Sequence, residues 1–249
     1  MSILVTGGTR GLGRAISLQL SDFGARVLAG YFQNETAAQE LCLEAQRRAL
    51  HIGTFKANLM AATGVQALAT HAINELGKID ALVYNCATGV HKSLAELGVR
   101  HLSGVWSLNV GAFFDLASQL RPHMPNGSRI IAISSEGARK AVRQYGAVGS
   151  SKAALEALCR QMAAEWAVDG ILVNLVAPGL LETDTLSVLP DAADRVRDEV
   201  RSSPLRRLVR LEEVAQVVHF LCSRASSGVV GQTIAVDGGK SVSAIADVS

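Results

Sequence analysis

Short apolar runs alternate with longer segments of helical hydrophobic spacing along most of the chain. Residues 2–6 form an apolar run, and in residues 12–20 the side chains of Leu12, Ile16 and Leu20 fall on one helical face. The same alternation predicts further strands and helices. Strands are expected at residues 26–31, 51–57, 81–85, 129–134, 171–176 and 233–236, and helices at residues 36–49, 65–76, 99–120 and 150–167.

The strand-like runs are apolar at nearly every position, which indicates that both faces of the sheet are covered. Because strands alternate with helices, right-handed crossovers should join parallel neighbours. We therefore expect an α/β fold, with a single doubly wound parallel sheet and helices on both faces, occupying residues 1–249 as one domain. Ligands of such sheets bind beyond the carboxyl ends of the strands. The irregular stretch after residue 178, extended by a helix, therefore predicts a substrate lid around residues 180–210.

A glycine-rich loop lies between the first expected strand and the first expected helix. Gly7 permits a tight turn, Gly11 lets the backbone approach a pyrophosphate, and Gly13 lets the helix pack closely on the sheet. The N-terminus of the helix then offers unpaired N–H groups to phosphate. A glycine pattern in this position predicts a dinucleotide-binding Rossmann fold.

The end of the second expected strand indicates which dinucleotide binds. Proteins that bind NAD usually carry an acid there, which holds the ribose hydroxyls of the adenosine, but residues 30–34 contain none. Arg10, in the glycine loop, is instead placed to meet a 2′-phosphate. We therefore expect NADP(H) to be the cofactor.

Composition argues against several other classes of protein. A net charge of +2 argues against a protein that mainly binds nucleic acid, and no apolar run approaches the roughly 20 residues of a membrane span. The four cysteines lack the spacing of a zinc or redox site, and the N-terminus lacks the pattern of a secretory leader. We therefore expect a soluble, cytoplasmic protein without a metal site. Six arginines within residues 195–210 form either a solvated surface or a docking site for an acidic partner.

Several motifs resemble those of the short-chain dehydrogenases/reductases, and the match covers nearly the whole chain. These motifs are Thr6-Gly7-x-x-x-Gly11-x-Gly13, Asn109 in the long helix, Ser135 at a strand end, Ser151-Lys152-Ala153, Pro178-Gly179-x-x-x-Thr183 and Val236-Asp237-Gly238-Gly239. The resemblance implies that Ser135, Lys152 and Asn109 belong to the catalytic set. It also implies a cofactor site formed by Gly7, Thr9, Arg10, Gly11, Leu12, Gly13, Tyr31, Asn58, Asn85, Ala87, Lys152, Pro178, Gly179 and Thr183.

The chain departs from that family in the position of its tyrosine. The usual spacing Tyr-x-x-x-Lys would place the tyrosine at residue 148, which is Val148 here. The nearest tyrosine is Tyr145, and the spacing Tyr-x6-Lys resembles the enoyl-acyl-carrier-protein reductase branch, especially the third bacterial type, which uses NADPH. A second departure replaces the usual Asn-Asn-Ala-Gly by Tyr84-Asn85-Cys86-Ala87.

The altered spacing suits reduction of a conjugated double bond. Seven residues span about two helical turns, so Tyr145 and Lys152 would face one cleft, separated by about 10 Å along the helix axis. Hydride delivered to the β-carbon of an enoyl thioester develops charge on the more distant thioester oxygen, which a displaced phenol can stabilise. Lys152 would hold the nicotinamide ribose and lower the pKa of the phenol through its charge.

Other interpretations remain open at this point. Tyr145 is then a cleft-lining residue, Ser135 a simple strand-end hydroxyl, and Asn109 a helix-packing residue. One rival activity is NADPH-dependent reduction of a polyketide-type ketone, and another reading is a regulatory protein that binds the dinucleotide without catalysis.

The expected partners follow from the same resemblance. An acyl carrier protein would present a thioester substrate, and residues 150–167 and 236–249 would build a homotetramer. No metal-binding spacing relates His91, His101, His123 and His219, which are interpreted as ordinary residues.

Overall fold

A seven-stranded, all-parallel sheet forms the centre of the protein in the computed structural model, which describes residues 1–183, 186 and 191–243. The order of its strands is β3-β2-β1-β4-β5-β6-β7. The strands are β1 (Ser2–Thr6), β2 (Arg26–Tyr31), β3 (Ile52–Lys56), β4 (Ala81–Tyr84), β5 (Arg129–Ile133), β6 (Leu172–Pro178) and β7 (Thr233–Val236). The expected doubly wound α/β fold is confirmed.

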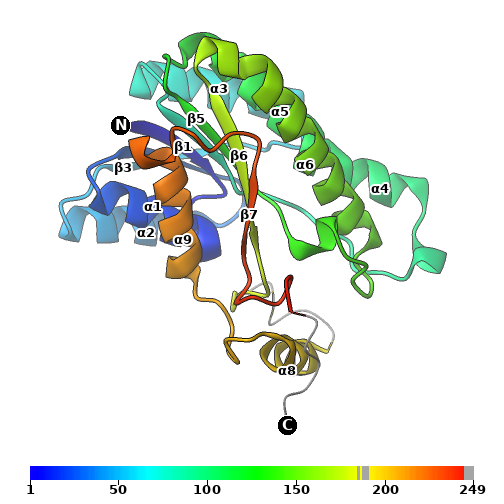
Figure 1. Ribbon diagram of the computed structural model, residues 1–249. Coiled ribbons are helices and arrows are strands. Elements are labelled where there is room, and N and C mark those ends of the chain that lie inside the picture. Colours follow the sequence, from blue (N-terminus) through cyan, green and yellow to red (C-terminus); the bar gives the residue numbers. More distant parts are fainter. Residues whose placement is uncertain (184–185, 187–190, 244–249) are drawn as a thin grey trace.

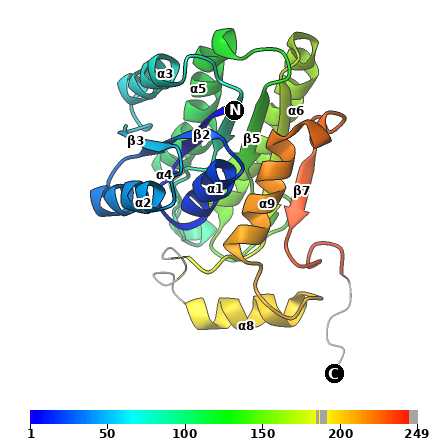
Figure 2. The ribbon, with the colours of Figure 1, turned by 90° about the vertical axis from the view of Figure 1, so that its left-hand side faces the viewer.

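Helices cover both faces of the sheet (Figures 1 and 2). The helices are α1 (Gly11–Asp22), α2 (Glu35–Arg47), α3 (Ala62–Leu76), α4 (Val99–Trp106), α5 (Phe113–Leu120), α6 (Gly146–Trp166), α8 (Ala192–Ser202) and α9 (Leu211–Cys222). Alternate side chains of β1 point to opposite faces, so Leu4 packs with α3, α5 and α6, whereas Ile3 and Val5 pack with α1 and α9. The apolar core is thereby divided into two layers, one on each side of the sheet.

The long helix expected at residues 99–120 is interrupted. A π-helical segment, Ser107–Ala112, separates α4 from α5, and it carries Asn109. The Asn109 side chain accepts a hydrogen bond from the backbone N–H of Thr88 at 2.9 Å and donates one to the Ser151 hydroxyl at 2.9 Å. π-Bulges often occur at functional sites, and this one directs the Asn109 amide into the protein core between two neighbouring segments.

Helix α6 begins at Gly146, earlier than the expected residue 150. Two glycines in its first turn, Gly146 and Gly149, have low intrinsic helix propensity, which hides the start of the helix from pattern analysis. Close packing requires the second of them, because a Cβ at Gly149 would lie 2.6 Å from the Gly137 carbonyl oxygen, whereas one at Gly146 would meet the exposed side chain of Leu94 at 2.6 Å. Helix α9 was not anticipated from the sequence at all, although Val214, Val218 and Leu221 give it a buried stripe.

The order of the strands fixes where a ligand can bind. Strand β1 lies between β2 and β4, so the chain winds outward in both directions from this point and leaves a crevice at the carboxyl ends of the strands. Helix α8 lies beyond those ends, near the ends of β6 and β7 (Figure 1). It belongs to the lid expected at residues 180–210, of which residues 184–185 and 187–190 lie outside the described residues, as do 244–249 of the C-terminal segment. Within the described chain, none of the helices combines the length and the apolar character needed to cross a membrane.

The packing of α1 on β1 makes a first prediction. A Cβ at residue 13 would lie 1.9 Å from the carbonyl oxygen of Gly7, so Gly13→Ala should destabilise the fold by about 1–3 kcal/mol or more. Gly104→Ala in α4 is the matched control, because a Cβ there meets nothing within 4 Å. It should be neutral or should stabilise by about 0.5–1 kcal/mol. Urea unfolding of both variants measures the difference, and equal midpoints would contradict the packing argument.

Candidate active site

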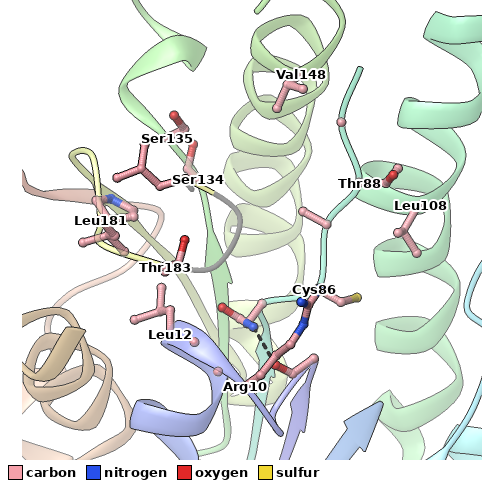
Figure 3. Close-up of a pocket in the computed structure, with 18 of the residues that line it drawn as sticks. Arg10, Leu12, Cys86, Thr88, Leu108, Ser134, Ser135, Val148, Leu181 and Thr183 are labelled. Atoms are coloured by element: carbon pink, nitrogen blue, oxygen red, sulfur yellow. Dashed lines mark hydrogen bonds between the residues drawn. The ribbon is translucent and has the colours of Figure 1, made fainter. Parts of the chain in front are cut away.

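A cavity of about 1630 Å³ opens at the carboxyl ends of the strands. The glycine loop, the segments that follow β2, β4, β5 and β6, and one side of α8 line it. Figure 3 shows side chains from these separate elements pointing into the same space, among them Arg10, Cys86, Ser135, Val148 and Thr183. The cavity therefore collects residues that are far apart in the sequence.

The glycine loop forms a cradle of backbone groups. Gly7 has a φ of +61° and Gly11 a φ of +51°, which is the left-handed region that favours glycine. Helix α1 starts at Gly11 with no side-chain cap from Arg10 and no acid in its first turn, so its N–H groups and positive dipole end face the cavity unopposed. Of the residues that the structure describes, a Cβ on Gly11 would meet only Thr183, at 3.6 Å. These features fit a dinucleotide pyrophosphate.

Asn85 holds the glycine loop to the segment after β4. Its side-chain amide donates to the Gly7 carbonyl at 3.0 Å, and its backbone N–H donates to the Thr6 hydroxyl at 3.1 Å. The backbone N–H of Cys86 donates to the same hydroxyl at 3.2 Å. Asn85 thus lines the cavity and also fixes the spacing between two of its walls.

The segment after β2 has one acid just beyond residues 30–34. Glu35 lines the cavity and begins α2, and its carboxylate forms an ion pair with Lys56 at 3.0 Å. Asn34 caps the N-terminus of α2, because its side-chain oxygen accepts a hydrogen bond from the backbone N–H of Ala37 at 2.9 Å. No unpaired acid therefore stands at the end of β2.

Tyr145 lies immediately before α6 and faces the end of β5. Its ring packs over Gly137, where an added Cβ would lie 2.4 Å from it. Its hydroxyl donates a hydrogen bond to the Ser135 hydroxyl at 3.3 Å, and Ser135 also accepts from the Gly137 N–H at 3.3 Å. The structure thus brings together the two hydroxyls proposed from the sequence, although they belong to different elements.

The acidity of Tyr145 differs from the sequence-based expectation. Burial raises the pKa of the phenol above its usual value; the hydrogen bond to Ser135 opposes this effect, and the charge of Glu136 adds to it. The expectation that Lys152 would lower this pKa is wrong for this arrangement. A buried phenol beside a carboxylate keeps its proton at neutral pH and is available as a hydrogen-bond donor.

Val148 occupies the position at which the resembled family carries its tyrosine. Its side chain is buried and contacts Gly89, where an added Cβ would lie 2.8 Å from one of its methyl groups. Figure 3 shows Val148 on α6 beside the cavity. It contributes an apolar surface at this point and no proton donor.

Lys152 and Asn109 lie behind the cavity wall and do not line it. The Lys152 amine donates to the Ile133 carbonyl at 2.7 Å. Burial lowers its pKa to about 8, against the opposing effect of the nearby Cys86 and Cys159 thiols. Lys152 thus reaches the cavity only by exchanging the Ile133 carbonyl for a ligand.

The other residues expected to form the site do line the cavity. They are Gly7, Thr9, Arg10, Gly11, Leu12, Gly13, Tyr31, Asn58, Asn85, Ala87, Pro178, Gly179 and Thr183 for the cofactor, with Tyr145 and Ser135 for the chemistry. No group of histidine, cysteine or acidic side chains that could hold a metal ion occurs among the described residues.

Two parts of the site were not predicted from the sequence. His91, interpreted as ordinary, lines the cavity with its ring centroid 5.7 Å from that of Tyr145, and its buried Nδ1 has no hydrogen-bond partner among the described residues. Burial lowers the pKa of this histidine, and the charge of Arg195 lowers it further. Glu136, Glu199 and Lys240 also line the cavity. His91, Glu136 and Lys240 follow strand ends, which is the one sequence signal that marked them.

The arginine-bearing segment is largely engaged in local pairs. Arg207 binds Glu213 through two hydrogen bonds of 2.8 and 2.7 Å, and Arg210 pairs with the same carboxylate at 3.4 Å. Arg197 pairs with Asp194 within α8. The charge that this segment offers to an acidic partner is correspondingly reduced, which favours the interpretation as a solvated surface.

A family model matches most of the chain. The model is described as enoyl-(acyl carrier protein) reductase and matches residues 7–241. Among curated proteins, a 1-cyclohexenylcarbonyl-CoA reductase of Streptomyces collinus is 33% identical over 241 residues, covering 96% of this chain and 86% of that protein. A tropinone reductase homologue of Arabidopsis thaliana is 34% identical over 253 residues, covering 96% and 91%.

Solved structures agree with the architecture. A short-chain dehydrogenase/reductase from Serratia marcescens superposes with a TM-score of 0.90 at 28% identity, covering 96% of this chain and 97% of that one. A short-chain dehydrogenase from Burkholderia cenocepacia, solved in complex with NADP, gives 0.89 at 25% identity, with coverage of 96% and 97%.

The buried amine of Lys152 makes a second prediction. Burial penalises its charged form, so Lys152 should lose its proton near pH 8, well below the ordinary lysine value of 10.5. NMR of the lysine Cε signals of the labelled protein should show one titration step near pH 8, and Lys152→Met should remove it. A spectrum in which every lysine titrates near its ordinary value would contradict the burial of the amine.

Proposed function

The chain belongs to the short-chain dehydrogenase/reductase family, and on that premise we propose that it is an NADPH-dependent reductase of the carbon–carbon double bond in an α,β-unsaturated thioester. Membership makes it an NAD(P)-dependent oxidoreductase. The choice of NADPH and the enoyl substrate are the proposal. The family model described as an enoyl reductase and the similar enoyl-CoA-type relative of Streptomyces collinus support it.

One observation carries the proposal: the proton donor is displaced along α6. Val148 stands where a ketone-reducing member of the family would carry its phenol, whereas the hydroxyl of Tyr145 lies near the start of α6 beside Ser135. In ketone reduction the oxygen that needs a proton is bonded to the carbon that takes hydride. In enoyl reduction the oxygen is two bonds further away, which suits a donor moved away from the cofactor end of the helix.

The residues of the chain have separate roles in this reaction. A nicotinamide held in this cavity would supply the hydride for the β-carbon of the thioester. Tyr145 donates a hydrogen bond to the thioester oxygen, where negative charge develops as the double bond shifts to the enolate. A proton from solvent would then be added at the α-carbon as the enolate returns to the thioester. Because burial keeps the phenol protonated, Tyr145 stabilises the developing charge without having to acquire a proton first.

Lys152 would hold the nicotinamide ribose. Its amine is buried against the Ile133 carbonyl, and ribose hydroxyls are equivalent acceptors that would replace that bond. Asn109 acts on the cofactor site indirectly, because its hydrogen bond to Ser151 fixes the turn of α6 that carries Lys152. Ser135 orients the Tyr145 hydroxyl by accepting its hydrogen bond.

The preference for NADPH rests on two parts of the cavity, the glycine loop and the segment after β2. Arg10 lines the cavity at the glycine loop. The segment after β2 offers no competing unpaired acid, since Glu35 is paired with Lys56. A 2′-phosphate would therefore meet a cation and no unpaired carboxylate.

A second candidate function has one specific observation in its favour. The Tyr145 and Ser135 hydroxyls are 3.3 Å apart, so a ketone oxygen could bind between them and receive the phenol proton. Reduction of a carbonyl group would then replace reduction of a double bond, and the similarity to tropinone reductase homologues is consistent with it.

The decisive assay compares the two substrate classes. With crotonyl thioesters, on coenzyme A and on an acyl carrier protein, NADPH consumption should exceed that with a panel of ketones. Tyr145→Phe should lower turnover on the thioester by about 10²–10³, the typical effect of losing one preorganised oxyanion donor, and should leave the dissociation constant of NADPH nearly unchanged. Full activity of this variant would overturn the role of Tyr145 in both candidate reactions.

Val148→Tyr separates the two candidates. It restores a phenol at the usual family position, nearer the carbon that takes hydride. Combined with Tyr145→Phe, it should leave thioester reduction impaired if the substrate is an enoyl group, because the phenol then lies too close to the cofactor. Recovery of ketone turnover in the double variant, relative to Tyr145→Phe alone, would favour the ketoreductase geometry instead.

Cofactor choice gives a further prediction. Arg10→Gln should weaken NADPH binding by about 10- to 100-fold, as expected for loss of a hydrogen bond to a charged group, and should change NADH binding little. Arg26→Gln is the matched control, since Arg26 starts β2 at the opposite end of the sheet and pairs there with Glu75. Fluorescence titration measures both constants. A wild-type preference for NADH would contradict the assignment.

A further inference from the structure

Three charged residues from distant parts of the chain meet beside the cavity. Lys240, in the turn after β7, forms ion pairs with Glu136 and with Glu199 of α8. The distance from the Lys240 amine to the Glu136 carboxylate is 2.8 Å. Glu136 directly follows Ser135. The cluster therefore joins the segment after β5, helix α8 and the turn after β7. These three residues are called the charge link below.

The charge link attaches α8 to the rest of the described chain through the one buried side chain of this helix. Glu199 is the single buried residue of this helix, and the remaining residues from Ala192 to Ser202 are exposed or half-buried. One Glu199 oxygen accepts from the backbone N–H of Leu180 at 3.1 Å, and the other binds Lys240. A surface helix usually buries an apolar stripe, but the one buried side chain of α8 is a carboxylate.

The turn that carries Lys240 is itself rigidly built. The Asp237 carboxylate accepts hydrogen bonds from the N–H groups of Gly239 at 3.0 Å and Ser241 at 2.9 Å. The Ser203 hydroxyl, just after α8, donates to the Gly238 carbonyl at 3.1 Å. The Lys240 amine is thereby presented from a fixed backbone toward both carboxylates.

We propose that Lys240 is a positioning residue, which sets the placement of α8 over the substrate end of the cavity and fixes Glu136 beside Ser135. The inference rests on the proposed function only in taking this cavity as the active site. Arg195 and Asp198 of α8 line the cavity, so a shift of the helix changes the walls that a substrate meets. Lys240 does this without being part of the serine, tyrosine and lysine set.

A purely structural role would be served at least as well by apolar side chains. A buried ion pair is weak evidence for stability, because desolvation of its charges offsets their attraction. It is, however, specific in direction and position, and a segment with few buried apolar contacts opens at low free energy. Such a link suits a helix that must adopt one defined position when substrate binds and leave that position when product is released.

The test measures α8 directly by hydrogen exchange of the full chain with NADPH bound. Lys240→Met should speed exchange of amides in residues 192–202 by about tenfold or more, and should leave α9 as slow as in the wild type. Lys240→Arg should restore the wild-type rates, because arginine keeps the charge and can span both carboxylates. Arg197→Gln is the control, since it removes only an exposed pair within α8 and should leave exchange unchanged.

A second variant protects the test against misfolding. Lys240→Met leaves two carboxylates without their cation, whereas Glu199→Gln keeps the acceptor for the Leu180 N–H and leaves Lys240 paired with Glu136. Glu199→Gln should also loosen α8 selectively. Wild-type exchange rates of α8 in both variants, or an equal increase throughout the chain, would overturn the proposal.

Kinetics supply a readout independent of stability. With whichever substrate the wild type reduces, Lys240→Met should raise KM by about tenfold, with a smaller effect on kcat and none on NADPH affinity. Equal loss of kcat and unchanged KM would overturn the positioning role. If the wild type reduces no enoyl thioester, the proposed function fails, while the exchange of α8 still decides the role of Lys240 on its own.

Discussion

The backbone contact between Gly7 and Gly13 determines how closely α1 lies against the sheet. Because no side chain fits between the two residues, the first turn of α1 is held at the edge of β1 with its N–H groups directed into the cavity. Asn85 binds the Gly7 carbonyl from the other side and so ties the segment after β4 to the same point. This one contact therefore determines where the other walls of the cavity lie relative to the glycine loop.

A series of hydrogen bonds connects the glycine loop with the turn of α6 that carries Lys152. The segment that begins with Asn85 continues to Thr88, whose backbone binds the side chain of Asn109. Asn109 in turn binds Ser151, the neighbour of Lys152 on α6. The lysine and the phosphate cradle are therefore positioned by one connected set of buried polar groups. Because its central residue, Asn109, is completely buried, leaving this network half-satisfied would be costly, and the Asn109 amide does have partners for both its oxygen and its nitrogen.

Local patterns were sufficient to predict the sheet and the glycine loop. Strand β2 matches its expected bounds, residues 26–31, because a buried parallel strand is a continuous apolar run with clear ends. The sequence places the start of α6 too late, since Gly146 and Gly149 have low helix propensity and Gly149 is required by its close approach to the Gly137 carbonyl. The meeting of Glu136, Glu199 and Lys240 has no local signature at all, because the three residues are brought together only by the crossovers of the fold.

The π-helical segment at Ser107–Ala112 has a consequence for how this protein can change in evolution. It accommodates a wider turn than an α-helix, so the chain there contains one residue more than regular winding requires. Loss of one residue before Asn109 would convert the wide turn to regular winding, so that α4 and α5 keep their register while Asn109 moves around the helix axis by up to about 100°. The Asn109 amide would then point away from Ser151. Insertions and deletions should therefore be tolerated in surface loops of relatives, while the length of this helix stays constant.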